Sequence, residues 1–186
     1  MSQIKGERSI TINAPRELVY QYISDFRRHT EWNYQVQEID LEPGKQIEAG
    51  TLFRAKERPP KHLPLMMKLM FPLMARMVGM DGTTETEVTE LEPNHKIAWN
   101  AAAPLKGGDL WMRAEWEIEL HDQNGSTLVT QRFQYFPEHE KAKSGMDPEK
   151  ATAMTREGVD ENLATLKHTL EAQAASDLST GSSVGS

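Results

Sequence analysis

The stretch LWMRAEWEIELHDQNGSTLVTQRFQYF, residues 110–136, decides the fold. Apolar and polar residues alternate along Leu110–His121, which is the two-residue period of a strand with one buried and one solvated face. Asn124 and Gly125 then favour a tight hairpin turn, and Ser126–Phe136 returns as a second strand. This hairpin therefore predicts an antiparallel sheet whose apolar face must be covered by another element.

The segments upstream of this hairpin show the same period of two. Turn residues such as Pro43-Gly44 and Gly107-Gly108 separate them. The further predicted strands are Ser9–Asn13, Val36–Leu41, Thr51–Arg58, Thr83–Leu91 and Lys96–Ala102.

Helical signals occur near both ends of the chain. Pro15 favours a helix start before an apolar stripe, and Asp25–Trp32 predicts a second short helix. Asp147 and Pro148 favour the start of a long helix that we expect to end near Gln173. Its apolar stripe is Met154, Val159, Leu163, Leu166 and Leu170.

Only this C-terminal helix is long enough to cover the sheet. We therefore predict an α+β helix-grip fold, in which a curved antiparallel sheet of about seven strands wraps around the C-terminal helix. Two short helices follow the first strand, and a helical insertion separates the third and fourth strands.

Composition narrows the classes of function. The chain of 186 residues suits a single domain, which we place over residues 1–175, followed by a disordered Ser/Gly tail at 176–186. A formal net charge of −7 argues against nucleic-acid binding, and no cysteine is available for a disulfide or thiolate site. Met1–Arg8 is polar and unlike a signal peptide, so a cytoplasmic protein is expected.

Three segments resemble the START-like, or SRPBCC, superfamily, which includes the polyketide cyclase/dehydrase-like proteins. They are SITINAPRELVYQYISDFRRHTEW (9–32), TEVTELEPNHKIAW (86–99) and GVDENLATLKHTLE (158–171). The resemblance implies a helix-grip fold and a cavity between sheet and helix. Members include polyketide cyclases, aromatase subunits and carriers of lipids or coenzyme Q. The apolar segment Pro59–Met80 departs from the simplest members, in which a short turn would be usual.

Strand parity separates inward-facing from outward-facing residues. The inward set is mainly aromatic and aliphatic with a few polar groups, as in a pocket for an apolar ligand. The alternative is that these side chains only pack against the helix. The candidate ligand-binding residues are Trp32, Phe53, Thr86, Trp99, Met112, Trp116, Gln131, Phe133 and Tyr135.

Catalysis has weaker support in the sequence. Glu57 is the one carboxylate that parity places inward, and with Tyr135 or Gln131 it could assist proton transfer. The alternative is that Glu57 only pairs with Arg58. Nucleophile and phosphate-loop motifs are missing, and neither a cofactor nor a metal is expected. We expect histidines 29, 62, 95, 121, 139 and 168 to be solvated, and Pro137–Lys143 to be a mobile connector.

The segment Pro59–Met80 holds six of the ten methionines. Pro64 and Pro72 interrupt it, so it is too broken to span a membrane and predicts a pair of helices. An apolar surface element must be buried, dock on a partner or lie on a bilayer. We interpret it as a lid that touches a membrane when open; the alternatives are a permanently packed helix or a homodimer interface. The candidate lid residues are Leu65, Met66, Leu69, Met70, Leu73, Met74 and Met77.

Three hypotheses about function follow. The first is a carrier that binds a lipid-, polyketide- or isoprenoid-like molecule in an internal cavity. The second is a cyclase, aromatase or dehydratase that uses the same cavity. The third is a protein-interaction domain that docks through the insertion.

Overall fold

A computed structural model describes residues 3–59, 61 and 65–181. The expected break at Pro64, the expected solvated His62 and residues 182–186 of the expected tail lie outside the described residues. The side chain of the candidate lid residue Met74 also lies outside them.

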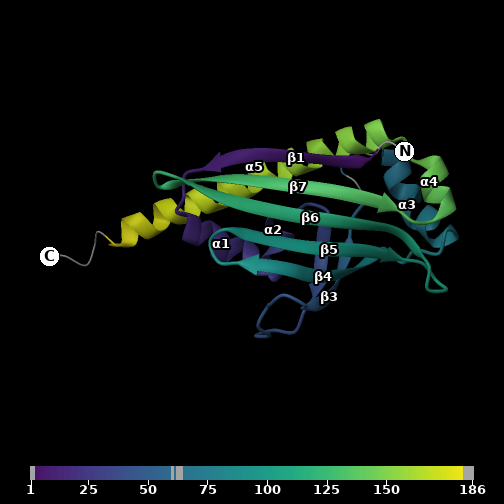
Figure 1. The fold of residues 1–186 in the computed structure, drawn as a ribbon, viewed down its shortest axis with the longest axis horizontal. Coiled ribbons are helices and arrows are strands. Elements are labelled where there is room, and N and C mark those ends of the chain that lie inside the picture. The colour runs from purple at the N-terminus through teal and green to yellow at the C-terminus, as the bar shows by residue number, and fades with distance from the viewer. Residues whose placement is uncertain (1–2, 60, 62–64, 182–186) are drawn as a thin grey trace.

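One antiparallel sheet of seven strands forms the body of the protein, in the order β1-β7-β6-β5-β4-β3-β2. Strands β2 to β7 are neighbours in chain order, whereas β1 pairs with the last strand (Figure 1). The strands are β1 (Ile4–Ile12), β2 (Val36–Asp40), β3 (Leu52–Glu57), β4 (Thr83–Glu92), β5 (Lys96–Pro104), β6 (Leu110–Gln123) and β7 (Ser126–Pro137).

The long C-terminal helix runs along the sheet beside β1 (Figure 1). A short helix and a second helical segment, made of a 3₁₀ turn that continues into an α-helical turn, follow β1, and a separate helix lies between β3 and β4, as the sequence predicted. The helices are α1 (Arg16–Ser24), η1 (Phe26–Arg28), α2 (His29–Trp32), α3 (Leu65–Met77), α4 (Glu140–Gly145) and α5 (Pro148–Gly181). The predicted α+β helix-grip class is confirmed.

The core lies between the inner face of the sheet and α5. The predicted alternation of β6 is confirmed, because Ile118 and Leu120 are fully buried while Arg113 and Glu115 are exposed. On α5 the predicted stripe is buried from Val159 onward, with Leu163, Leu166 and Leu170 at 0–1% exposure. Burial of these aliphatic side chains, at about 1.5–3 kcal/mol each, supplies most of the energy that holds helix and sheet together.

Four element boundaries differ from the sequence-based expectation. β1 begins at Ile4 rather than Ser9. In the additional part of the strand, Lys5 and Glu7 face outward, and Gly6 pairs with the core residue Phe133. The expected mobile connector contains α4, whose start is capped by the His139 ring accepting a hydrogen bond from the Lys141 backbone. Its Ala142 is buried, which ties the segment to the body.

The other two differences concern helix ends. α5 continues beyond Gln173 to Gly181, because an alanine-rich segment forms helix without burying a large face. α3 is one helix that contains Pro72, so the expected pair of helices is wrong. A proline removes one backbone donor and bends a helix, and here the helix continues through it.

Candidate ligand-binding site

The inner face of the sheet is closed in its middle and accessible toward one end. In the middle, Val88, Ile97 and Ile118 are fully buried. Beyond them, the inward positions of β5 and β6 are partly accessible; they are Ala101, Ala103 and Met112. Because alanine extends only one methyl group from the sheet, the inner face carries only small side chains on β5 at this end.

α3 is attached on both sides of that end of the sheet. On one side, Lys61 makes a 3.0 Å ion pair with Glu161 of α5 shortly before α3 begins. On the other side, Gly79 accepts a 2.9 Å hydrogen bond from the Lys106 backbone in the turn between β5 and β6. The segments that flank α3 therefore connect it to α5 and to the β5–β6 turn, and Figure 1 shows α3 at this end of the sheet.

Glu57 of β3 lies on the inner face of the sheet at the same end. Its carboxylate accepts a 3.1 Å hydrogen bond from the Thr84 hydroxyl of the neighbouring strand. Its side chain is exposed at this end of the sheet, although the surrounding protein removes part of its hydration. Desolvation raises the pKa of Glu57 above its usual range, and the hydrogen bond from Thr84 opposes this shift.

Tyr135 of β7 lies near enough to Glu57 for the charge of that carboxylate to act on its phenol. Its ring lies edge-on to Trp116 at 5.7 Å between centroids, and it is partly accessible. Burial is the largest cause that raises the pKa of the phenol, and the charge of Glu57 raises it further. A hydrogen bond with the Thr155 side chain of α5 lowers the pKa and so opposes the shift. Three strands separate β3 from β7 in the sheet, so this electrostatic interaction requires the sheet to curl.

The predicted aromatic wall lies beside this polar pair. Trp99 and Trp116 stack with centroids 6.0 Å apart and an interplanar angle of 8°, and Phe133 lies 5.9 Å from Trp116. The structure divides the nine candidate ligand-binding residues by depth. Trp32, Phe53, Thr86, Trp99, Gln131 and Phe133 are buried, whereas Met112, Trp116 and Tyr135 are partly accessible.

Two of the buried candidates carry polar atoms that lack a hydrogen-bond partner within the described part of the chain. They are the indole Nε1 of Trp32 and the side-chain oxygen of Gln131. Trp32 is 2% exposed and Gln131 is 1% exposed. Because buried polar atoms are nearly always paired, each is a candidate contact for a ligand atom or a buried water.

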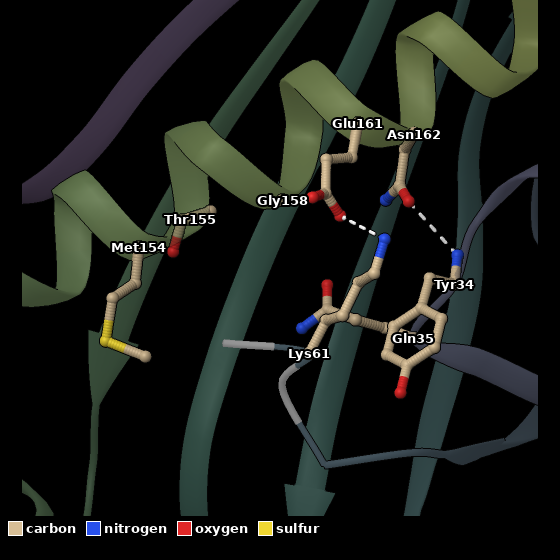
Figure 2. Close-up of a pocket in the computed structure, with 8 residues that line it drawn as sticks. All are labelled: Tyr34, Gln35, Lys61, Met154, Thr155, Gly158, Glu161 and Asn162. Carbon is tan, nitrogen blue, oxygen red and sulfur yellow. Dashed lines mark hydrogen bonds and ion pairs between the residues drawn. The ribbon is translucent and has the colours of Figure 1, made fainter. Parts of the chain in front are cut away.

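A seam between α5 and the segments next to α3 contains a small cavity of about 30 Å³ (Figure 2). This is room for a water molecule or two. Asn162 closes the seam, because its amide accepts a 3.0 Å hydrogen bond from the Tyr34 backbone and donates a 3.0 Å bond to Asn33. The cavity is lined by Tyr34, Gln35, Lys61, Met154, Thr155, Gly158, Glu161 and Asn162.

A broader hollow of about 750 Å³ is lined mainly by residues of the outer face of the sheet, together with Trp116, Phe133 and Arg156. Arg132 bonds Glu7 at 3.1 Å and Glu117 at 2.6 Å across it. Charges that already pair with one another beside water form an ordinary solvated sheet face. We therefore place the candidate site on the inner face.

The expectation that all histidines are solvated is wrong for His29. This residue is 3% exposed, stacks on Phe26 with centroids 4.5 Å apart and bonds the Ile23 carbonyl oxygen at 2.9 Å. Its packing places the imidazole in the core, where desolvation lowers its pKa to about 4. His95, His121 and His168 are exposed as expected, whereas His139 is only half-exposed and stacks on Trp111.

Within residues 3–59, 61 and 65–181, no three His, Asp or Glu side chains gather to hold a metal ion. No helix in the same ranges is long and apolar enough to cross a membrane.

Sequence reasoning missed several residues of the site. Parity placed Thr84 inward, but nothing marked it as the partner of Glu57. Thr155 and Asn162 face the sheet from α5, where the apolar stripe was the only visible signal. The available clue was that both polar residues lie within one helical turn of the apolar stripe of α5.

Comparison with known proteins identifies the family and the fold. A family model described as "Polyketide cyclase / dehydrase and lipid transport" matches residues 3–171. No curated protein matches the sequence. Among solved structures, a Streptomyces aromatase/cyclase has a TM-score of 0.60 at 13% identity, covering 94% of each chain. A START superfamily protein from Mycobacterium smegmatis has a TM-score of 0.58 at 12% identity, covering 92% of this chain and 99% of that one. At these identities the structural likeness establishes the fold.

Proposed function

Because the chain belongs to the polyketide cyclase/dehydrase and lipid transport family, we propose that it binds and carries a hydrophobic small molecule. The ligand is lipid-, polyketide- or isoprenoid-like, and we propose that it occupies a hollow between the inner face of β3–β7, α3 and α5. The observation that carries this proposal is the change along the inner face. A closed core gives way to partly accessible alanine, methionine and aromatic side chains around one polar pair. Apolar walls with few polar groups are typical of small-molecule pockets.

Native mass spectrometry of the purified protein tests the proposal by detecting a bound apolar molecule. Ala103→Phe fills the hollow, because Ala103 is an inward position of β5 opposite Met112. Ala102→Phe is the matched control, since the next residue on the strand faces the other side of the sheet. We expect wild type and Ala102→Phe to retain the ligand and Ala103→Phe to lose it. Equal occupancy in the two variants would exclude this site.

We propose that α3 is the lid of this hollow. Six of its apolar side chains are exposed, and their spacing of one, three or four residues puts them on one side of the helix. Ala75, on the opposite side, is 6% exposed. The exposed set is Leu65, Met66, Leu69, Met70, Leu73 and Met77, at 49–79%. When the lid opens, this surface docks on a lipid bilayer. The alternative is that two copies of the protein associate through the same surface.

The cyclase or dehydratase reaction is a second candidate, and the electrostatic interaction between Glu57 and Tyr135 favours it. Glu57 has a raised pKa, and Tyr135 keeps its proton beside it, so one group can accept a proton while the other donates a hydrogen bond. The test is turnover of a poly-β-ketone thioester. A loss of about a hundredfold or more in Glu57→Gln and Tyr135→Phe indicates catalysis. Unchanged turnover with altered binding supports the carrier alone.

A further inference from the structure

The exposed face of α3 carries a positive charge among its apolar side chains. Leu65, Leu69 and Leu73 are 74%, 73% and 57% exposed, and Arg76 is exposed as well. Steps of three or four residues connect these four positions, so they form one row along the helix. Arg76 makes no ion pair with any residue that the structure describes. The row is therefore both apolar and cationic.

The sequence around α3 lacks acidic residues. The segment Pro59–Met80 contains Lys61, Lys68 and Arg76 and neither Asp nor Glu, although the whole chain has a formal net charge of −7. An apolar helix with Lys and Arg as its charged residues is typical of elements that lie in the interface of a bilayer.

Acidic residues near α3 belong to the neighbouring turns and strand ends. They are Glu57 at the end of β3, Asp81 before β4, and Asp109 in the β5–β6 turn beside Lys106. Asp81 accepts hydrogen bonds of 2.6 and 3.0 Å from the hydroxyl and backbone of Thr83. These bonds direct its carboxylate toward the start of β4. The charge on the exposed row of α3 is thus that of Arg76.

Arg76 distinguishes between the possible occupants of this face. If two copies of the protein packed α3 against α3, each Arg76 would be buried without an acidic partner, because α3 contains no Asp or Glu. Burial of an unpaired charge is costly. At a bilayer surface, the apolar stem of an arginine lies along the helix while its guanidinium reaches the headgroups. Negatively charged headgroups attract that guanidinium.

We propose that the partner of α3 is an anionic bilayer surface, on which its leucines and methionines enter the interface and Arg76 contacts lipid phosphates. This inference rests on the proposed docking of α3 and names its partner. The remaining charge of the chain is negative and is repelled by such a surface. Salt screens this repulsion beyond about 10 Å at 0.1 M, so α3 can make the contact at the end of the sheet (Figure 1).

Flotation with lipid vesicles tests the proposal. One set of vesicles consists of phosphatidylcholine, and in the other phosphatidylglycerol replaces part of it. At about 0.1 M salt we expect the wild-type protein to bind the anionic vesicles about fivefold more tightly, which is the contribution of one basic residue near an anionic surface. Near 1 M salt, where the screening length is about 3 Å, we expect the preference to disappear.

Substitution of Arg76 assigns the preference to α3. Arg76→Gln should bind anionic vesicles about fivefold more weakly and neutral vesicles unchanged, whereas Arg76→Lys should keep the preference because it keeps the charge. Lys45→Gln is the matched control. It makes the same change in net charge at an exposed position of the β2–β3 loop, before the start of β3, whereas α3 follows the end of that strand. Thermal unfolding establishes that each variant is folded.

The outcomes separate this inference from the proposed function. If the wild-type protein binds neither kind of vesicle, the docking of α3 on a bilayer is wrong and its anionic partner falls with it. Native mass spectrometry still decides the carrier function. If both kinds are bound equally, or if Arg76→Gln and Lys45→Gln behave alike, docking stands and the anionic partner is wrong. A dimer that ignores both vesicles assigns the face to a second copy and overturns the inference.

Discussion

The Nε2 atom of His29 lies 2.9 Å from the carbonyl oxygen of Ile23, deep in the core. A carbonyl oxygen only accepts, so Nε2 carries the proton and the imidazole is neutral. The buried ring resists a second proton, and its pKa is about 4 instead of 6.5. This pair makes the stability of the fold depend on pH.

The first prediction is that the free energy of unfolding falls as the pH drops from about 7.5 to 5. Between the folded pKa of about 4 and the unfolded value of 6.5, the unfolded chain binds more protons, so acid favours unfolding. The expected loss from His29 is about 2 kcal/mol over this range. Urea denaturation at the two pH values measures it. His29→Gln has a shallower dependence, His95→Gln matches wild type, and equal slopes in all three proteins contradict the prediction.

The second prediction concerns Glu57, whose raised pKa means that the folded protein holds its proton more tightly than the unfolded chain. Stability from this group is lost as the pH rises above the ordinary value of 4.5 toward the folded pKa. Glu57→Gln should therefore raise the melting temperature near pH 8 and leave it unchanged near pH 4. Because the side chain is accessible to water, the gain is at most about 1 kcal/mol, or roughly 2–4 °C. A lower melting temperature at pH 8 contradicts the raised pKa.

The third prediction is that Asn162 contributes more to closure of the seam than the ion pair beside it. Asn162→Ala leaves the Tyr34 backbone N–H without its partner and removes one of the two hydrogen bonds to the Asn33 side-chain oxygen, at a cost of about 1–3 kcal/mol. Lys61→Ala costs less than about 1 kcal/mol, because the Lys61 and Glu161 side chains are 52% and 38% exposed. Urea denaturation of both variants decides the order, and a larger loss in Lys61→Ala reverses it.

The fourth prediction compares two glycines. A Cβ at Gly6 would lie 2.9 Å from the buried Phe133 ring and 2.9 Å from the Arg156 side chain, so Gly6→Ala must displace the core. We expect a loss of about 1–3 kcal/mol. A Cβ at Gly158 of α5 meets nothing within 4 Å, so Gly158→Ala should gain up to about 1 kcal/mol from helix propensity. Thermal unfolding of the two variants should therefore shift in opposite directions.

The fifth prediction is that polar substitutions on the exposed face of α3 change association without changing stability. Leu69→Gln with Leu73→Gln alters side chains that are 73% and 57% exposed, so the melting temperature should stay within about 1 °C. Liposome co-sedimentation should decrease, because the apolar area available to a bilayer is smaller. Ala75→Gln is the contrasting variant and destabilises the fold, since Ala75 is buried. If the wild-type protein does not co-sediment with liposomes but elutes as a dimer, the exposed face of α3 serves self-association instead.

The fold could be predicted largely from alternation. On β6 almost every second residue is apolar, and on β7 Val129, Phe133 and Tyr135 share one face, so inner and outer faces were separable without knowledge of partners. β1 was foreshortened because Gly6 and Arg8 occupy inward positions of its first half, which hides the alternation. A strand at the edge of the sheet tolerates such residues, because they can contact the adjoining helix or solvent and need not fill the core.

The candidate site was only half predictable. Parity of β3 and β7 placed Glu57 and Tyr135 inward, but their facing depends on the curl of the whole sheet, which no local pattern encodes. The burial of His29 was missed because its partners Phe26, Trp32 and Trp99 combine one short helical segment with a distant strand.

The pairing of β1 with β7 has a consequence for how the chain is made. Each register contact of β1 joins residues at opposite ends of the protein, such as Ile4 with Tyr135 and Ile12 with Thr127. Strands β2 to β6 can pair in the order in which they leave the ribosome, whereas β1 emerges first and must wait for nearly the last segment. Contacts between such distant residues slow folding, and the waiting strand leaves Ile4, Ile10 and Ile12 uncovered. A chaperone that holds this N-terminal strand during synthesis would therefore increase the yield of folded protein.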